Sequence, residues 1–152
     1  MSESGFDSGL FDPQQAGVHA VADSDLPLLD LAARDAGLRV AWIDLQHCTG
    51  KPMLLLRMAM ALDFPEGSGR NWDALADLLR DLSWLDAPHG HALLLGTAQD
   101  LREAAPDDFD ILLSILQDAA EFHAEGEVPF WAFIGLPEDE LDAAPEQDDD
   151  AF

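Results

Sequence analysis

Apolar residues occur along the chain in two patterns, short continuous runs and longer stretches with helical spacing. Continuous runs of strand length are typical of strands covered on both faces, and they occur at 38–45, 92–95 and 128–134. Stretches with helical spacing occur at 26–36, 53–62, 72–82 and 109–125, with a shorter one within 96–104. Strands that alternate with helices predict a small α/β domain with a parallel sheet.

Individual residues refine these elements. Asp25 and Asn71 are good helix N-caps, because their side-chain oxygens can accept from free backbone N–H groups. Trp42 and Trp72 are expected in the core. The buried side of the helix 72–82 is predicted to contain Trp72, Leu75, Leu78, Leu79 and Leu82, and that of 109–125 to contain Phe109, Leu112, Leu113, Leu116 and Ala120.

The two ends of the chain differ from its middle. Residues 1–24 have few large apolar groups and read as a loosely held arm, although 17–21 is compatible with a short edge strand. Residues 137–150 contain eight acidic residues and no base, which is typical of disorder. We therefore divide the chain into an N-terminal extension with one helix (1–37), a domain (38–136) and an acidic tail (137–152).

The charge of the chain limits its partners. Seven Lys and Arg residues stand against 31 Asp and Glu residues, which gives a formal net charge of −24. Such a field repels nucleic acid and anionic membranes and attracts basic proteins, although acidity can also serve solubility alone. A single Cys and the lack of a signal or membrane-spanning run favour a soluble, cytoplasmic protein.

Acidic residues form two stripes at helical spacing. Asp73 and Asp77 lie four residues apart, as do Glu121 and Glu125, and Asp118 continues the second stripe. No base on the helix 109–125 pairs with its acids. If both stripes meet on one side, they form an acidic surface without an internal counter-ion. The alternative is a pair of ordinary solvated helix faces.

Other candidate chemistry is weak. The pairs His89/His91 and His47/Cys48 lack a second pair at metal-ligand spacing. Residues 67–69 are too short for a phosphate loop and lack its lysine. We predict no metal, no cofactor and no catalytic residue. A hydrolase that uses Asp73 and Asp77 as a carboxylate pair would need a closed pocket around them.

The run Phe64-Pro65-Glu66, followed by Gly69-Arg70-Asn71-Trp72-Asp73-Ala74-Leu75 and Asp77, resembles the central signature of the barstar family, the intracellular inhibitors of barnase-type ribonucleases. The order of elements over 38–134 is similar too. The resemblance implies a three-stranded parallel sheet packed by helices.

The resemblance also implies a binding surface. Asp77 matches the aspartate that occupies a phosphate position in the ribonuclease active site, and Asp73 matches an interface aspartate one turn earlier. Glu121 and Glu125 match acidic interface residues on the later helix. Two positions that are aromatic in the family's interface are Gly67 and Ala76 here, and Asn71 begins the signature helix.

These observations lead to one functional hypothesis and one alternative. The hypothesis is an inhibitor or immunity-type protein, not an enzyme, that occludes the basic active site of a ribonuclease or related toxin. The alternative is an acidic adaptor that binds another basic protein through its surface or its tail. No nucleic acid or membrane partner is expected, and the oligomeric state is open.

Overall fold

The computed structural model describes residues 12–139. The predicted disorder of the tail from 140 onward lies outside this range. A four-stranded, all-parallel sheet has the order β1 (Val18–Ala22), β4 (Phe130–Leu136), β3 (His91–Gly96) and β2 (Arg39–Asp44). The helices are α2 (Leu26–Asp35), α3 (Lys51–Ala61), α4 (Trp72–Asp81), α5 (Ala98–Ala104) and α6 (Pro106–Glu125), and short 3-10 turns span Pro13–Gln15 and Asp23–Asp25. The α/β architecture predicted from the sequence is confirmed.

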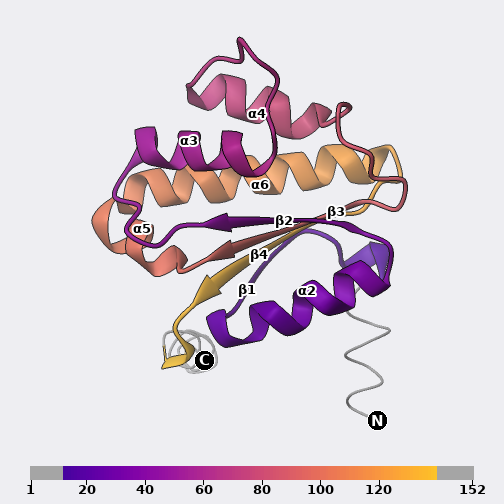
Figure 1. Cartoon of the computed structure of the whole chain (residues 1–152), viewed down its shortest axis with the longest axis horizontal. Helices are drawn as coiled ribbons and strands as arrows, with labels where there is room; N and C mark the ends of the chain where they lie inside the picture. The colour runs from indigo at the N-terminus through magenta and orange to yellow at the C-terminus, as the bar shows by residue number, and fades with distance from the viewer. Residues whose placement is uncertain (1–11, 140–152) are drawn as a thin grey trace, which may run out of the picture.

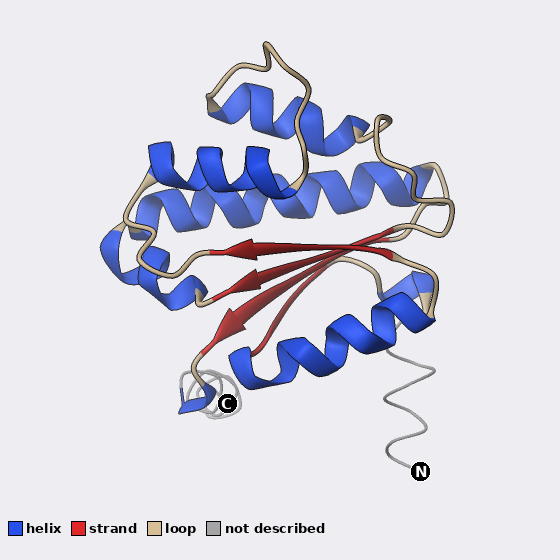
Figure 2. Cartoon of the chain, in the orientation of Figure 1, coloured by secondary structure: helices blue, strands red, loops and turns tan. Residues whose placement is uncertain are grey.

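The helices cover the sheet unequally. Helices α3 and α6 lie over one face, α4 lies beyond them, and α2 covers the opposite face (Figure 1; Figure 2). The larger core therefore lies between the sheet and the helices α3 to α6, and a smaller core forms under α2 around Leu26, Leu29, Trp131 and Phe133. The strands β3 and β4 are buried throughout except at Gly96, as continuous apolar runs predict.

The expectation of three strands is wrong, because β1 is a fourth. Val18 to Ala22 pair in parallel with Ala132 to Leu136, so β1 covers the outer edge of β4. The 3-10 turn that follows is fixed as well, since the Asp23 carboxylate accepts from the backbone N–H of Thr97 at 2.8 Å. Residues 18–22 are therefore part of the sheet, and 23–25 are fixed against it, so this segment is not a loose arm.

The expectation that β2 is buried on both faces is also wrong. Among the described residues β2 pairs with β3 alone, so it is an edge strand. Its Trp42 side chain is 41% exposed and donates from Nε1 to the Asp30 carboxylate at 2.9 Å. A tryptophan has a large apolar ring and one polar N–H, so it suits such a half-covered site. An apolar run in the sequence does not show that one of its residues is exposed in this way.

The helix caps give a mixed outcome. The Asn71 side chain accepts from the N–H of Ala74 at 2.7 Å, so this N-cap is confirmed. Asp25 precedes α2 but makes no side-chain cap hydrogen bond, because it already has a helical backbone conformation.

Buried positions were largely predicted: Leu75, Leu79, Leu82, Phe109, Leu112, Leu116 and Ala120 are buried, whereas Trp72, Leu78 and Leu113 are only partly buried.

Candidate functional site

Helix α4 holds the first acidic pair. Asn71 caps its N-terminus, and Leu75 and Leu79 anchor one side in the core. Asp73 and Asp77 are both exposed and lie one turn apart on the opposite side, as their spacing relative to the leucines requires. Asp73 stands in the first turn, where the positive end of the helix dipole favours an anion. The helix thus presents two carboxylates to solvent on a rigid, capped support.

One of these carboxylates has an internal counter-ion, contrary to expectation. The Asp77 carboxylate lies 2.5 Å from Nη2 of Arg80, three residues later on the same helix. Both side chains are well exposed, at 73% for Asp77 and 40% for Arg80. An exposed pair of this kind contributes only about 0–1 kcal/mol. A partner can therefore separate Arg80 from Asp77 at small cost.

Helix α6 holds the second acidic pair. Glu121 and Glu125 are exposed, and His123 between them is buried. Nε2 of His123 lies 2.7 Å from the carbonyl oxygen of Leu79, so that nitrogen donates to α4. Asp118, Glu121 and Glu125 make no ion pair within residues 12–139. The second stripe thus has no counter-ion among the described residues.

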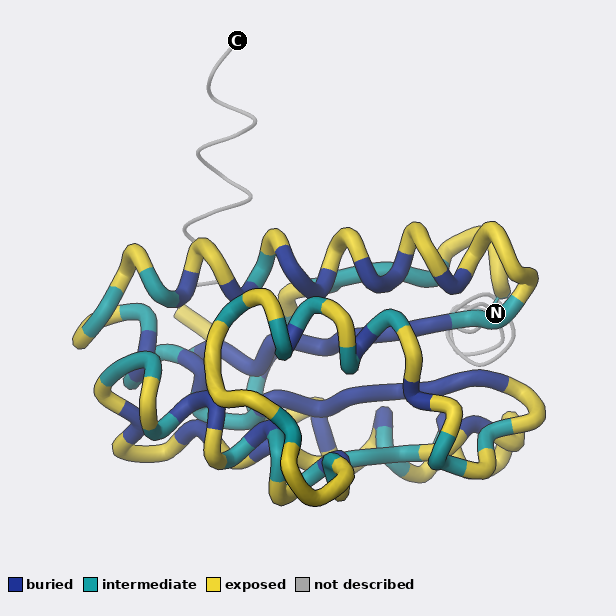
Figure 3. Tube along the Cα trace, turned by 90° about the horizontal axis from the view of Figure 1, so that it is seen from above, coloured by how far each residue is buried: buried dark blue, intermediate teal, exposed yellow. Residues whose placement is uncertain are grey.

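The two stripes lie on helices that pack against each other. The contact between His123 and Leu79 places the C-terminal part of α6 against the C-terminal part of α4. The exposed positions of α6 follow the outer edge of the molecule in Figure 3, away from the other helices. The acids of α6 and those of α4 thus lie on two helices that pack together, each on the side of its helix that faces solvent.

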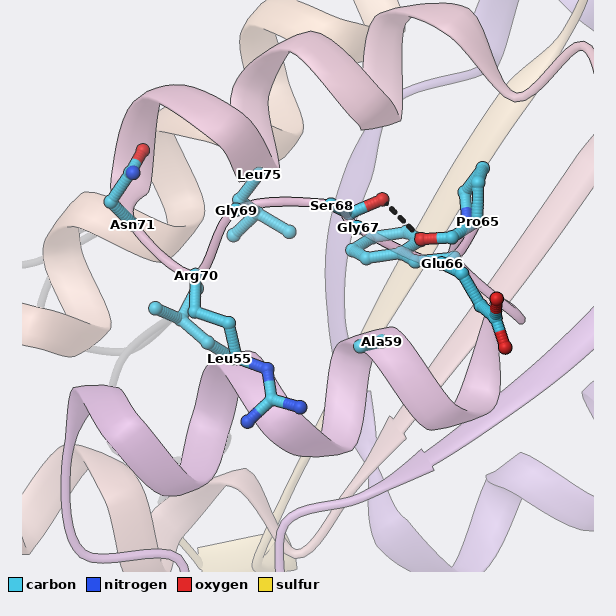
Figure 4. A pocket seen from close by; sticks show the side chains of 11 residues that line it. Leu55, Ala59, Pro65, Glu66, Gly67, Ser68, Gly69, Arg70, Asn71 and Leu75 are labelled. Carbon is cyan, nitrogen blue, oxygen red and sulfur yellow. Dashed lines mark hydrogen bonds between the residues drawn. The ribbon is translucent and has the colours of Figure 1, made fainter.

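The loop before α4 encloses a small cavity of about 300 Å³ (Figure 4). Its apolar lining comes from Leu55, Ala59, Phe64 and Leu75, and the loop supplies Gly67 and Arg70. Gly67 has φ +85°, and a Cβ built there meets nothing within 4 Å. Position 67 is therefore open to a partner, whereas Ala76 is partly buried.

Two bases stand close to this acidic area. The ammonium of Lys51 lies 5.6 Å from the centre of the Trp72 ring, and Lys51 and Arg70 line a second cavity of about 380 Å³. Sequence reasoning missed this cluster, because Lys51 and Arg70 are far apart in the chain. Charges of both signs therefore meet at the start of α4, whereas α6 contains acids but no Lys or Arg.

Other acids serve the fold. Asp108 accepts from the N–H of Lys51 at 3.0 Å and thereby caps α3, and Asp100 accepts from the N–H of His47 at 2.6 Å. With Asp23, these carboxylates satisfy backbone donors on other elements, where a charged acceptor makes a strong hydrogen bond. They are not available to a partner.

The remaining candidates offer no reactive site. Cys48 is fully buried, and burial raises the pKa of its thiol, which disfavours the nucleophilic thiolate. No group of three or more His, Cys, Asp or Glu side chains between residues 12 and 139 is placed to hold a metal ion. In the same range no helix combines the length and apolarity that crossing a bilayer requires.

Comparison with protein families gives a match. The family described as Barstar (barnase inhibitor) matches residues 38–135, which span β2 to β4 and include both acidic helices. Strand β1 and helix α2 precede the matched region. No curated protein matches the chain.

Proposed function

Because the chain belongs to the barstar family, we propose that it inhibits a barnase-type ribonuclease by filling the basic active site with carboxylates. The observation that carries this proposal is the paired exposure of Asp73 and Asp77 on the outer side of α4, with Glu121 and Glu125 on the helix packed beside it.

The chemistry follows from what a ribonuclease binds. Its active site holds RNA phosphates with cationic side chains, so carboxylates at suitable spacing compete for the same groups. Asp73 and Asp77 would enter the site from α4, while Glu121 and Glu125 would meet cationic groups at its margin. Opposite charges on the two proteins also raise the rate of encounter.

The surface around α4 suits this use. Asn71 and the leucines of α4 hold the helix rigidly, so little conformational entropy is lost when it binds. Gly67 and Ala76 contribute no aromatic contact, so electrostatic contacts carry a large share of the affinity. We expect the dissociation constant of the complex to rise steeply with salt concentration, because the screening length falls to about 10 Å at 0.1 M ionic strength.

The test is inhibition of barnase or a related basic ribonuclease by the purified chain, with the variants Asp77→Ala and Glu121→Ala. Asp35→Ala is the matched control, because Asp35 is an exposed acid on α2, which covers the opposite face of the sheet. We expect Asp77→Ala to weaken inhibition at least about tenfold, or 1.4 kcal/mol. Equal inhibition by Asp77→Ala and Asp35→Ala, with both folded, contradicts the proposal.

A further inference from the structure

The open edge of β2 carries an apolar patch that the proposed function does not use. Five of the seven exposed large hydrophobic side chains described belong to α2, β2 and α3. Trp42 and Met60, 41% and 72% exposed, line one shallow groove of about 500 Å³ together with Arg57. Leu31, 67% exposed, follows Asp30, whose carboxylate holds the Trp42 indole. We call Leu31, Trp42 and Met60 the β2 edge patch.

The backbone of β2 is open beside this patch. The backbone N–H of Arg39 donates to the carbonyl of Gly90 at 2.9 Å, and that of Leu45 donates to the carbonyl of Gly96 at 2.8 Å. Both bonds point toward β3. Because alternate residues of a strand point in opposite directions, the N–H and C=O groups of positions 40, 42 and 44 face outward. Of these groups, the C=O of Asp44 already accepts from Arg57 at 2.8 Å. Exposed edges of this kind are sites where a further strand adds to a sheet.

Charges of both signs lie near the patch, so they suit a partner that also carries both signs there. The Asp30 carboxylate is occupied by Arg34 and by Trp42. The Asp44 carboxylate accepts from the N–H of Gln46, and Arg57 donates to the Asp44 carbonyl at 2.8 Å. Four of the seven bases of the chain lie on α2, β2 and α3, namely Arg34, Arg39, Lys51 and Arg57. The exposed Asp44 carboxylate makes no ion pair among residues 12–139, so it can meet a cationic group of a partner.

We propose that a second copy of the chain docks on the β2 edge patch, with the two β2 strands antiparallel. A two-fold axis at Trp42, the central outward-facing residue, sets Val40 of each copy opposite Asp44 of the other. The basic end of β2, at Arg39, then lies beside the acidic end of the other copy, at Asp44. This isologous contact joins both sheets into one.

The arrangement accounts for the exposed side chains on both sides of the edge. Helix α2 flanks β2 on one face of the sheet and α3 on the other (Figure 1). Leu31 and Trp42 therefore meet their symmetry mates on the α2 side, and Met60 meets its mate on the α3 side. The contact uses neither α4 nor α6, so the proposal stands independently of ribonuclease inhibition.

The test is the mass of the full chain in solution by sedimentation velocity, measured over a range of protein and salt concentrations. We expect a species of twice the 16.5 kDa chain mass. Salt should promote it, since at 1 M the screening length of about 3 Å removes repulsion between two copies that each carry −24. Added salt should therefore strengthen dimerisation, whereas it should weaken ribonuclease binding.

Two edge variants and one control decide the location of the contact. Met60→Lys and Trp42→Arg should each raise the dimer dissociation constant about tenfold or more, because each places a charge in the apolar contact. Met60 is so exposed that its variant keeps the fold even if Trp42→Arg does not. Ile111→Lys, on α6 and 37% exposed, should leave the constant unchanged. Amide hydrogen exchange at Trp42 should slow as dimer forms.

Three results would overturn the proposal. The first is a 16.5 kDa species under all conditions. The second is a dimer that Met60→Lys leaves intact. The third is a dimer that forms without any slowing of exchange at Trp42, which would place the contact away from the open edge.

Discussion

A buried histidine gives the fold a defined dependence on pH. His91 begins β3, is 5% exposed, and lies with its ring centre 5.9 Å from that of His123 and 6.3 Å from that of Phe130. Burial lowers the pKa of His91 from 6.5 to about 4, and the nearby charges of His123 and Arg39 act in the same direction. The folded protein therefore holds this imidazole neutral where the unfolded chain binds a proton.

The sign and size of the effect follow from the two pKa values. Above pH 6.5 the group is neutral in both states and its contribution to stability is fully present. Between pH 6.5 and about 4 the unfolded chain binds more protons, so the free energy of unfolding falls as the pH is lowered. At about 1.36 kcal/mol for each unit of pKa difference, the loss approaches roughly 3 kcal/mol.

Urea unfolding of the wild type and of His91→Leu between pH 7.5 and 4 measures this loss. We expect the stability difference between the two proteins to shift by roughly 3 kcal/mol in favour of the variant on going from pH 7.5 to 4. Comparison with the variant removes the shared effect of the carboxylates, which also titrate at low pH. His89→Leu is the control, since His89 is exposed. If the stability difference between the wild type and His91→Leu does not change between pH 7.5 and 4, the reasoning is refuted.

Three smaller perturbations test the site and its supports. Asn71→Ala should lower the free energy of unfolding by about 1 kcal/mol through loss of the α4 cap, with Asn71→Gly costing less in the same urea titration. Asp108→Ala should cost about 1–3 kcal/mol, because it leaves the Lys51 N–H without its acceptor; an unchanged urea midpoint would count against this cap. Arg80→Ala should change the free energy of unfolding by no more than about 1 kcal/mol. Because it frees the Asp77 carboxylate, it should also speed association with a basic ribonuclease, measured by stopped flow. A slower association would argue against a direct role for Asp77.

Much of the fold could be predicted from local patterns. The strands β3 and β4 and the helices α4 and α6 have strong periodicity, so their positions were correct within a few residues. Strand β1 was only weakly indicated, because it is short and contains two alanines. Its pairing depends on the free edge of β4, which is more than a hundred residues away in the chain. Such long-range pairing leaves no local signal.

The candidate site could be predicted only in part. Helical spacing alone places Asp73 and Asp77 on the side of α4 opposite Leu75 and Leu79. It does not show whether Arg80 turns back to Asp77 or extends into solvent. The burial of His123 and its bond to Leu79 depend on how α6 packs on α4, which one helical pattern does not determine.

The acidic residues of this chain divide into two groups by what they bind. Asp23, Asp100 and Asp108 accept from backbone N–H groups of distant elements, so their charge is used within the fold. Glu121 and Glu125, by contrast, make no bond of this kind among residues 12–139 and face solvent. Repulsion among such acids lowers stability unless a partner neutralises them. A cationic partner that binds the folded state should therefore stabilise it by mass action. The thermal midpoint of the wild type should rise with partner concentration. It should rise less in a double variant with Glu121→Gln and Glu125→Gln.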